Sequence, residues 1–253
     1  EGSIFAIKSL SGFHLCCTPY SENTVMELRK RKVRKSKPFA LMMRDIQTIE
    51  NFCYVNESEK QLLLSKERPI VILKKKQNNS LPNIVAPNNN YLGVMLPSTP
   101  LQILIFQTTD IDSLIMTSGN LSGLPLEFEN KKAIDNLRQF CDFFLMNDRD
   151  IFLPLDDSII KCTTYDNMII RRSRGYAPLP LLYKDSKEIL AVGGDMKNTF
   201  AISKGNYIYQ GPHNGELINY ESLERFKSNI EHYKKLFEIN PKLIVHDLHP
   251  NYE

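Results

Sequence analysis

The sequence of 253 residues contains no run of about 18 uncharged apolar residues, the length that a membrane-spanning helix requires. It also lacks the basic start, the apolar stretch and the cleavage site of a signal peptide. None of its five cysteines forms a C-x-x-C pair, so a zinc knuckle is not expected. The odd number of cysteines and the missing signal indicate free thiols in a reducing cytoplasm. The 42% of hydrophobic residues and the net charge of +3 exclude a disordered chain, a collagen and a coiled coil.

The sequence does not start with methionine, and strand-like segments lie close to both ends. We therefore expect a fragment that is cut inside a domain at one or both ends. Short apolar stretches typical of strands alternate with segments of helical periodicity. The expected strands are residues 3–10, 39–43, 69–73, 92–96, 113–117, 143–147, 158–162 and 168–172. The expected helices are residues 24–33, 45–54, 58–64, 99–107 and 130–141. This alternation predicts an α/β fold with a twisted mixed sheet.

A proline-containing segment, residues 176–180, interrupts the alternation and indicates a domain boundary. The predicted domains are residues 1–183 and 187–253, both truncated. The second is expected to contain strands 188–192, 199–203 and 207–210, a hairpin turn at Lys204-Gly205-Asn206, a helix at 220–238 and a strand at 243–246. This hairpin–helix–strand order is typical of the start of actin-like and ribonuclease-H-like ATPase domains. About 65 residues are too few to complete one.

The segment Arg29–Lys37 contains seven basic residues and no acidic one. Such a concentration of charge attracts polyanions, either a triphosphate or a nucleic-acid backbone. The alternative is a solvated helix end whose cations complement the helix dipole. Composition alone favours anion binding and does not choose between ATP and RNA.

Four further segments carry polar groups that suit phosphate chemistry. Met116–Gly123 has hydroxyls and glycines after a buried strand, which suits an anion-binding turn or a plain polar turn, and it is not a Walker A loop. Asn147–Asp150 and Asp156–Ser158 contain paired carboxylates that either hold Mg²⁺ or cap a turn. Arg171–Tyr176 is either a phosphate-recognising segment or a basic linker.

The histidines give weaker signals. His14 is a lone histidine near the sheet, and such a residue is more often structural than catalytic. His246 and His249 have a spacing compatible with a metal, but a loop position is the simpler interpretation.

Together these segments resemble the YrdC-like domain of HypF carbamoyltransferases and the start of the C-terminal carbamoyl-transfer domain of that family. The matching motifs lie in the family's order at residues 7–15, 31–42, 92–101, 116–123, 147–149, 156–158, 171–178, 193–200 and 246–252. The sequence departs from the family at Ser9 and Ser11, where glycine is usual, and at Ser98 and Gln102, where Tyr and His are common. The resemblance therefore says least about the part of the substrate pocket near these positions.

The resemblance implies an enzyme that forms a carbamoyl-adenylate from ATP and carbamate derived from carbamoyl phosphate, as a ligase does. It then transfers the carbamoyl group to the C-terminal cysteine of HypE in [NiFe]-hydrogenase maturation. The implied cofactors are ATP and Mg²⁺, with zinc only in a family module absent here and no metal ligand in this chain. The implied location is the cytoplasm, without a membrane.

The resemblance also implies roles for individual residues. Lys32 and Arg34 would bind the phosphates, and Lys8 would contact the acyl group. The nucleotide and carbamoyl pocket would be lined by Ser118, Asn120 and Ser122, with Ser158 and Arg172 contacting the adenylate. A phosphate-binding hairpin of the second domain would begin with Asp195, Lys197 and Asn198.

Two alternatives remain open. One is a threonylcarbamoyl-adenylate synthase for tRNA modification, against which the residues after Leu190 argue. The other is a YrdC-like module that binds double-stranded RNA without chemistry. A steep salt dependence and no competition by ATP would identify the latter.

Overall fold

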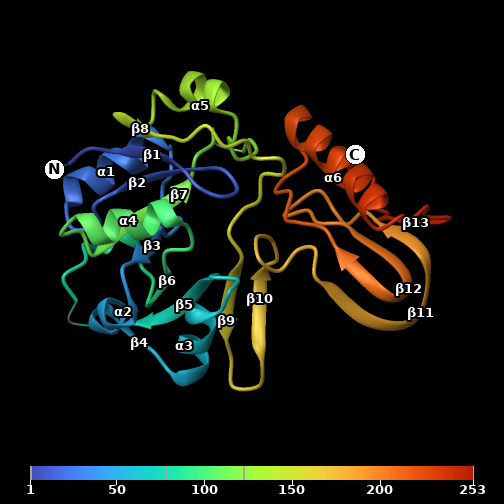
Figure 1. Ribbon diagram of the computed structural model, residues 1–253, viewed down its shortest axis with the longest axis horizontal. Helices are drawn as coiled ribbons and strands as arrows, with labels where there is room; N and C mark the ends of the chain where they lie inside the picture. Colours follow the sequence, from blue (N-terminus) through green and yellow to red (C-terminus); the bar gives the residue numbers. More distant parts are fainter. Residues whose placement is uncertain (1, 78, 122, 253) are drawn as a thin grey trace. The chain divides into compact units, whose positions relative to one another are not determined.

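The computed structural model describes residues 2–77, 79–121 and 123–252. The chain divides into two compact units (Figure 1). The first unit comprises Glu1–Ser122 and Leu126–Arg171, and the second comprises Gly123–Pro125 and Arg172–Glu253. The predicted domain limits at residues 183 and 187 stay a prediction.

The first unit is built on a ten-stranded mixed sheet with the order β10-β9-β5-β6-β3-β7-β2-β1-β8, in which β4 also pairs with β5. This confirms the predicted α/β class with a mixed sheet. The strands are β1 (Phe5–Lys8), β2 (Phe13–Cys17), β3 (Ala40–Met43), β4 (Cys53–Tyr54), β5 (Ile70–Lys75), β6 (Tyr91–Met95), β7 (Ser113–Ser118), β8 (Phe143–Leu145), β9 (Ile159–Cys162) and β10 (Asn167–Arg171).

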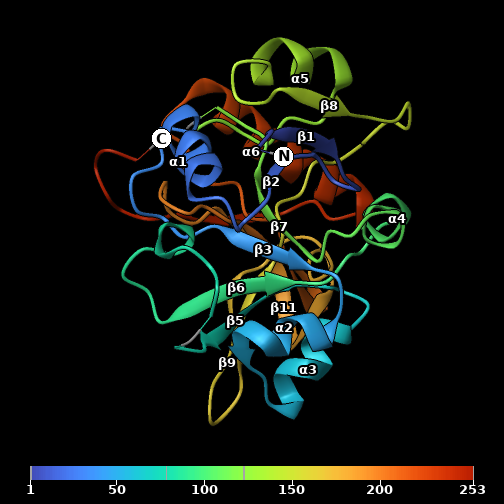
Figure 2. The ribbon, with the colours of Figure 1, turned by 90° about the vertical axis from the view of Figure 1, so that its left-hand side faces the viewer.

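The two faces of this sheet are covered unequally. The helices are α1 (Glu22–Arg31), α2 (Ile46–Phe52), α3 (Glu57–Leu64), α4 (Pro100–Thr108) and α5 (Asn130–Leu137), with a 3-10 turn η1 (Asn83–Val85). Apolar residues of α1, α2, α3 and α5 belong to the larger core, whereas α4 packs into the smaller one. Figure 2 shows β7, β3 and β6 next to one another, in the order in which they pair. Among the described helices, the smaller core contains residues of α4.

Side-chain alternation along β7 assigns its residues to these faces. Ile115 belongs to the larger core, while Leu114 and Met116 belong to the smaller one. Because successive side chains of a strand point to opposite faces, Ser118 lies on the same face as Met116.

The sequence analysis does not predict β2. All five of its residues are buried, so the alternation of polar and apolar residues that marks a half-exposed strand is missing. The strand is nevertheless central to the site, because it pairs with β1 on one side and with β7 on the other.

The second unit has its own small sheet and core. Its elements are β11 (Pro180–Ala191), β12 (Ala201–Gln210), α6 (Tyr220–Leu236) and β13 (Leu243–Val245), and the strand order is β12-β11-β13. The α6 residues Phe226, Ile230 and Tyr233 pack on Phe200 and Ile202 of the sheet side. The predicted long helix and final strand are therefore present.

Two predictions about this unit are wrong. Residues 201–210 form one strand, so Lys204-Gly205-Asn206 is not a hairpin turn. Gly205 instead faces Ser186 where the register between β11 and β12 shifts, and the Ser186 hydroxyl donates to the Gly205 carbonyl at 2.6 Å. A glycine with positive φ suits such an irregularity as well as it suits a turn. The strand expected at residues 188–192 also begins earlier, because β11 starts at Pro180.

Within the described residues, no helix is long and apolar enough to cross a membrane.

Candidate functional site

The basic segment begins at the end of α1, where Lys32 is the C-cap residue and Val33 has a positive φ of 51°. Buried Arg29 organises the loop that follows. Its guanidinium donates to the carbonyls of Ile84, Arg34, Lys37 and Val85 and lies 4.6 Å from the centre of the Phe39 ring. A single arginine thus ties together backbone groups far apart in sequence, which the alternative of a solvated helix end does not account for.

Lys32 is 8% exposed, and its Nζ donates to three oxygens at the end of β7. These are the Ser118 carbonyl at 2.8 Å, the Asn120 carbonyl at 2.9 Å and Asn120 Oδ1 at 3.0 Å. Burial lowers the pKa of Lys32 to about 7, and the nearby cations Arg34 and Lys37 contribute to this shift. The structure therefore holds a lysine next to neutral acceptors, with little anionic charge to balance it.

Arg34 lies beside Lys32 and contacts the same strand. Its guanidinium donates to Thr117 Oγ1 at 3.0 Å, to the Lys37 carbonyl at 3.0 Å and to the Pro38 carbonyl, and it lies 4.6 Å from the centre of the Phe39 ring. Burial lowers its pKa to about 10. At neutral pH the guanidinium is still charged, so Arg34 supplies a fixed cation next to a titratable one.

The end of β7 brings the Ser118–Asn120 turn against Lys32. Ser118 Oγ donates to Asn120 Oδ1 at 2.8 Å. Gly119 sits between them and donates its N–H to the Phe13 carbonyl at 2.7 Å. A Cβ at position 119 would lie 2.8 Å from that carbonyl oxygen, so this turn requires glycine. Lys32, Arg34, Ser118 and Asn120 thus form one polar cluster, and the predicted Ser122 lies outside the described residues.

A buried histidine–aspartate pair extends this cluster. His14 Nε2 lies 2.9 Å from Asp157 Oδ2, and the side chains are 7% and 9% exposed. The sequence analysis treated His14 as structural and Asp157 as a possible magnesium ligand or turn residue. No spacing in the sequence links residues so far apart, since only the pairing of β2 with β7 and β9 with β5 brings them together.

Two other predicted residues lie in the first unit. Lys8 is 3% exposed, and its Nζ donates to the carbonyls of Asn147 at 3.3 Å and Arg149 at 2.6 Å. It follows Ile7, which pairs with His14, so it points to the opposite face of the sheet. Ser158 is fully buried beside Asp157, and its carbonyl accepts from the Ile70 N–H at 2.8 Å.

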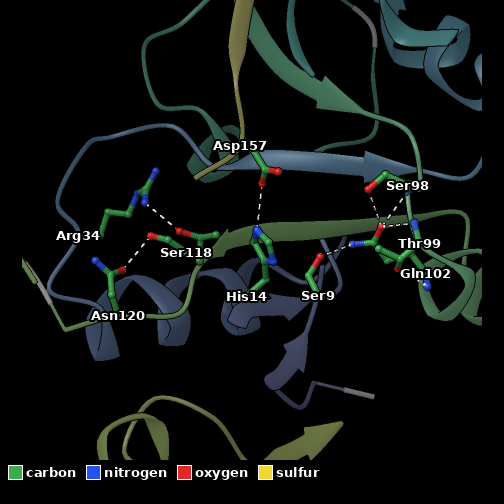
Figure 3. Close-up of polar contacts among 10 residues, drawn as sticks. Ser9, His14, Arg34, Ser98, Thr99, Gln102, Ser118, Asn120 and Asp157 are labelled. Carbon is green, nitrogen blue, oxygen red and sulfur yellow. Dashed lines mark hydrogen bonds and ion pairs between the residues drawn. The ribbon is translucent and has the colours of Figure 1, made fainter. Parts of the chain in front are cut away.

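Three of the four positions that depart from the family contact one another. Gln102 Nε2 donates to Ser9 Oγ at 3.3 Å, while Gln102 Oε1 accepts from the Ser98 N–H at 2.9 Å and the Ser98 hydroxyl at 3.2 Å (Figure 3). Gln102 also completes the capping box of α4 with Thr99. The fourth, Ser11, is buried and its hydroxyl has no partner among the described residues.

The predicted residues of the second unit form a different kind of site. Asn198 is buried, and its Nδ2 donates to the carbonyls of Val192 at 2.9 Å and Gly194 at 2.8 Å. Its Oδ1 accepts from Asn214 Nδ2 at 2.9 Å, and Asn214 Oδ1 accepts from Asn229 Nδ2 at 2.7 Å. Asn198 therefore holds the 193–198 loop in shape.

The neighbouring residues of that loop are placed by this network. Lys197 is exposed and has a positive φ of 50°, while the Asp195 carbonyl accepts from the Leu217 N–H at 3.1 Å.

Arg172 also belongs to the second unit. Its guanidinium donates to the Leu179 carbonyl at 2.9 Å, and burial lowers its pKa.

Two surface hollows lie away from the candidate residues. Within the described ranges, no group of three or more His, Cys, Asp and Glu side chains could hold a metal ion. A surface hollow of about 630 Å³ lies near α2 and α4, and one of about 300 Å³ lies against β11 and β12. Because neither is lined by a candidate residue, the polar contacts above define the site.

Comparison with known families gives two matches. Residues 1–173 match the Sua5/YciO/YrdC family, described as telomere recombination, and residues 184–253 match the HypF Kae1-like domain.

Curated relatives extend this result over the whole chain. The carbamoyltransferase HypF of Synechocystis sp. is 40% identical over 99% of the chain, and the probable carbamoyltransferase HypF of Methanocaldococcus jannaschii is 37% identical over 100% of it. Each alignment covers 33% of the relative, so the chain spans about a third of their length. A putative threonylcarbamoyl-AMP synthase of M. jannaschii is 35% identical over 41% of the chain.

Comparison with solved structures gives the same result as comparison with the curated relatives. Full-length HypF in its phosphate- and nucleotide-bound form has a TM-score of 0.95 and 43% identity, covering 99% of this chain and 40% of that one. T. kodakarensis HypF has a TM-score of 0.96 and 38% identity, covering 99% and 33%. P. abyssi Sua5 complexed with L-threonine has a TM-score of 0.61, covers 99% of this chain and 87% of that one, and at 12% identity shows the fold alone. The chain therefore belongs to the Sua5/YciO/YrdC family over residues 1–173 and is a homologue of the HypF carbamoyltransferases along its length.

Proposed function

We propose that this chain is the adenylate-forming part of a carbamoyltransferase. The observation that supports this most is the cluster of Lys32, Arg34, Ser118 and Asn120 in a chain homologous to HypF throughout. The nucleotide and phosphate bound to a HypF of similar structure support ATP as the substrate.

The proposed reaction needs positioned charge rather than a covalent nucleophile. A carboxylate oxygen of carbamate attacks the α-phosphorus of ATP, the bond to the β-phosphate bridge breaks, and carbamoyl-adenylate and pyrophosphate form. Negative charge spreads over the phosphate oxygens, so fixed cations and donors that face them stabilise the transition state. Lys32 and Arg34 would supply the cations, and the Ser118–Asn120 turn would supply hydroxyl and amide groups.

The lowered pKa of Lys32 also couples its protonation to nucleotide binding. With a pKa of about 7, part of the population carries no charge on Lys32 before the nucleotide arrives. A triphosphate brings the counter-charge that favours the protonated lysine. Mg²⁺ would arrive with ATP, because the described residues hold no acidic cluster of their own for it.

The remaining steps concern the longer proteins. We propose carbamoyl phosphate as the source of carbamate and the C-terminal cysteine of a HypE-type partner as the acceptor, within hydrogenase maturation. The match of residues 184–253 to the HypF Kae1-like domain supports a second site for that transfer.

The second candidate is a threonylcarbamoyl-adenylate synthase. The local similarity to a putative threonylcarbamoyl-AMP synthase favours it, but that similarity covers less than half of the chain. A double-stranded RNA-binding module would use the same basic segment, and ATP would not compete with RNA for it.

The test is pyrophosphate exchange into ATP by the chain. It is run with freshly dissolved ammonium carbamate and, separately, with threonine plus bicarbonate. We expect exchange that depends on carbamate and is lost in Lys32→Met. Exchange that depends on threonine would support the synthase. A folded chain without exchange under either condition contradicts the proposal.

A further inference from the structure

The hairpin of β1 and β2 contains two buried polar atoms without a partner among the described residues. They are the hydroxyl of Ser11 in the turn, in a residue that is 4% exposed, and Nδ1 of His14 on β2, in a residue that is 6% exposed. A buried polar atom without a hydrogen bond destabilises the fold, so a ligand that supplies the partner is favoured there.

Asp157 determines which ring nitrogen of His14 donates a hydrogen bond and which one can accept a hydrogen bond from such a ligand. An ionised carboxylate only accepts hydrogen bonds, so the ring nitrogen facing it, Nε2, is the donor. In the neutral ring, Nδ1 then carries a lone pair and accepts. Asp157 thereby fixes both the orientation and the tautomer of His14.

The strand register places this acceptor beside the proposed catalytic cluster. His14 pairs directly with Ser118 on β7, whose carbonyl accepts from Lys32 Nζ. Directly opposed residues of antiparallel strands have Cα atoms about 4.5–5.5 Å apart and side chains on one face. In the view of Figure 3, His14 lies between the Arg34–Ser118–Asn120 group and the Ser9–Gln102 contact.

The segment carrying Asp157 is anchored to the same turn. The Leu155 N–H donates to the Ser11 carbonyl at 3.1 Å, two residues before the aspartate. The turn of β1 and β2, His14 and Asp157 thus form one preorganised unit.

We infer that His14 Nδ1 accepts an N–H of the carbamoyl group and so selects an amide-bearing acid over bicarbonate. This inference rests on the proposed function. Carbamate and bicarbonate share a carboxylate-like end and differ in that one has NH₂ where the other has OH. Cations recognise the shared end, and at the other end NH₂ donates two hydrogen bonds whereas OH donates one. His14 Nδ1, held by Asp157, would accept the first, and the Ser11 hydroxyl, the second atom of this hairpin without a partner among the described residues, would accept the other, so the pair of acceptors favours carbamate. His14 makes no bond in the reaction and is a substrate-contacting residue.

Two substitutions separate this role from a structural one. In His14→Gln the amide nitrogen replaces Nε2, which keeps the donor to Asp157 and removes the Nδ1 acceptor. In His14→Asn the amide oxygen replaces Nδ1, which keeps the acceptor and loses the contact with Asp157. We expect His14→Gln to raise the KM for carbamate about tenfold or more with the KM for ATP unchanged, and His14→Asn to retain more carbamate affinity. The reverse order would show that the pair is structural and would overturn the inference.

A measurement on the unmodified chain does not depend on the variants folding or on turnover. The ring nitrogens are labelled with ¹⁵N, and their NMR signals are recorded with a non-hydrolysable α,β-methylene ATP present. We expect ammonium carbamate to shift the His14 Nδ1 signal more than the same concentration of sodium bicarbonate does, with the other four histidines as internal controls. No shift, or an equal shift with both, overturns the inference. A carbamate-specific shift without pyrophosphate exchange would refute the proposed reaction and support the contact. Pyrophosphate exchange without a shift of the His14 Nδ1 signal would support the proposed reaction and refute the contact.

Discussion

The loops at residues 29–38 and 193–198 were both expected to bind phosphate, and the structure builds them in opposite ways. In the first loop the charged residues Lys32 and Arg34 are held by backbone and side-chain oxygens of a neighbouring strand. In the second, the buried residue is the neutral Asn198, whose amide bonds to its own loop, and the cation Lys197 is exposed. The two loops therefore differ in what they bury, the cation Lys32 in the first and the neutral amide of Asn198 in the second.

Burial explains the difference. A buried cation loses hydration and gains from a nearby anion, so we expect Lys32 to favour an anionic ligand. A buried asparagine whose hydrogen bonds are all made within the loop is already satisfied and gains little from a ligand. Gly193 belongs to the same scaffold, because it has a φ of 70° and a Cβ there would collide with the Thr199 carbonyl.

The sharpest test of this contrast exchanges each lysine for methionine, which keeps much of the side-chain length and removes the charge. We expect Lys32→Met to lower carbamate-dependent pyrophosphate exchange by about a hundredfold or more, as for loss of one preorganised donor to a transition-state charge. Lys197→Met should leave that exchange within about twofold. Equal losses in both variants would remove the distinction between the loops.

A second test removes the scaffold amide. Asn198→Ala leaves the Val192 and Gly194 carbonyls and the Asn214 amide without their partner. We expect the free energy of unfolding of the second unit to fall by about 3 kcal/mol. Hydrogen exchange of β11 and β12 would show this as faster exchange, with β2 and β7 unaffected as the internal control. Unchanged exchange in β11 would mean that the amide chain is not what holds the loop.

A third test uses the titration of Lys32. Its pKa of about 7 in the folded chain lies below the ordinary value of 10.5, so between these pH values the unfolded chain binds more protons. The free energy of unfolding therefore rises with pH in that window, by up to about 1.4 kcal/mol per pH unit from this group.

The same titration predicts proton uptake. At pH 8 the free lysine is mostly neutral and ATP favours its charged form, so binding should take up as much as about one proton. Titration calorimetry in two buffers of different ionisation enthalpy measures this number. Lys32→Met should show less uptake, and proton release by the unmodified chain would contradict the assignment.

The smallest expected effect is at Lys197, which has the left-handed φ of 50°. Glycine adopts this conformation without strain, so Lys197→Gly should change the free energy of unfolding by less than about 1 kcal/mol and be neutral or stabilising. Thermal unfolding measures it, with Lys227→Gly at an exposed position within α6 as a destabilising comparison. A large loss in Lys197→Gly would show that the side chain has a structural contact of its own.

Much of the fold was predictable because local patterns carry it. The apolar pattern near Ile70 predicts a strand, and the pattern that includes Phe226 and Ile230 predicts a helix. Both elements are present in the structure. The strand Phe13–Cys17 escaped because a fully buried strand has no alternation to detect. The hairpin turn predicted at Gly205 was wrong because a glycine at a register shift and a glycine in a turn cannot be distinguished by sequence alone.

The sequence by itself determined which residue types are present for anion chemistry: the basic segment at 29–37, the Ser118–Asn120 turn and the family to which they belong. Only the tertiary structure decided how they act, because burial and hydrogen-bond partners arise between strands distant in the chain. Packing of β7 against the end of α1 lowers the pKa of Lys32, and pairing of β2 with β7 brings His14 beside Ser118. The contact of His14 with Asp157 joins residues that no local pattern connects.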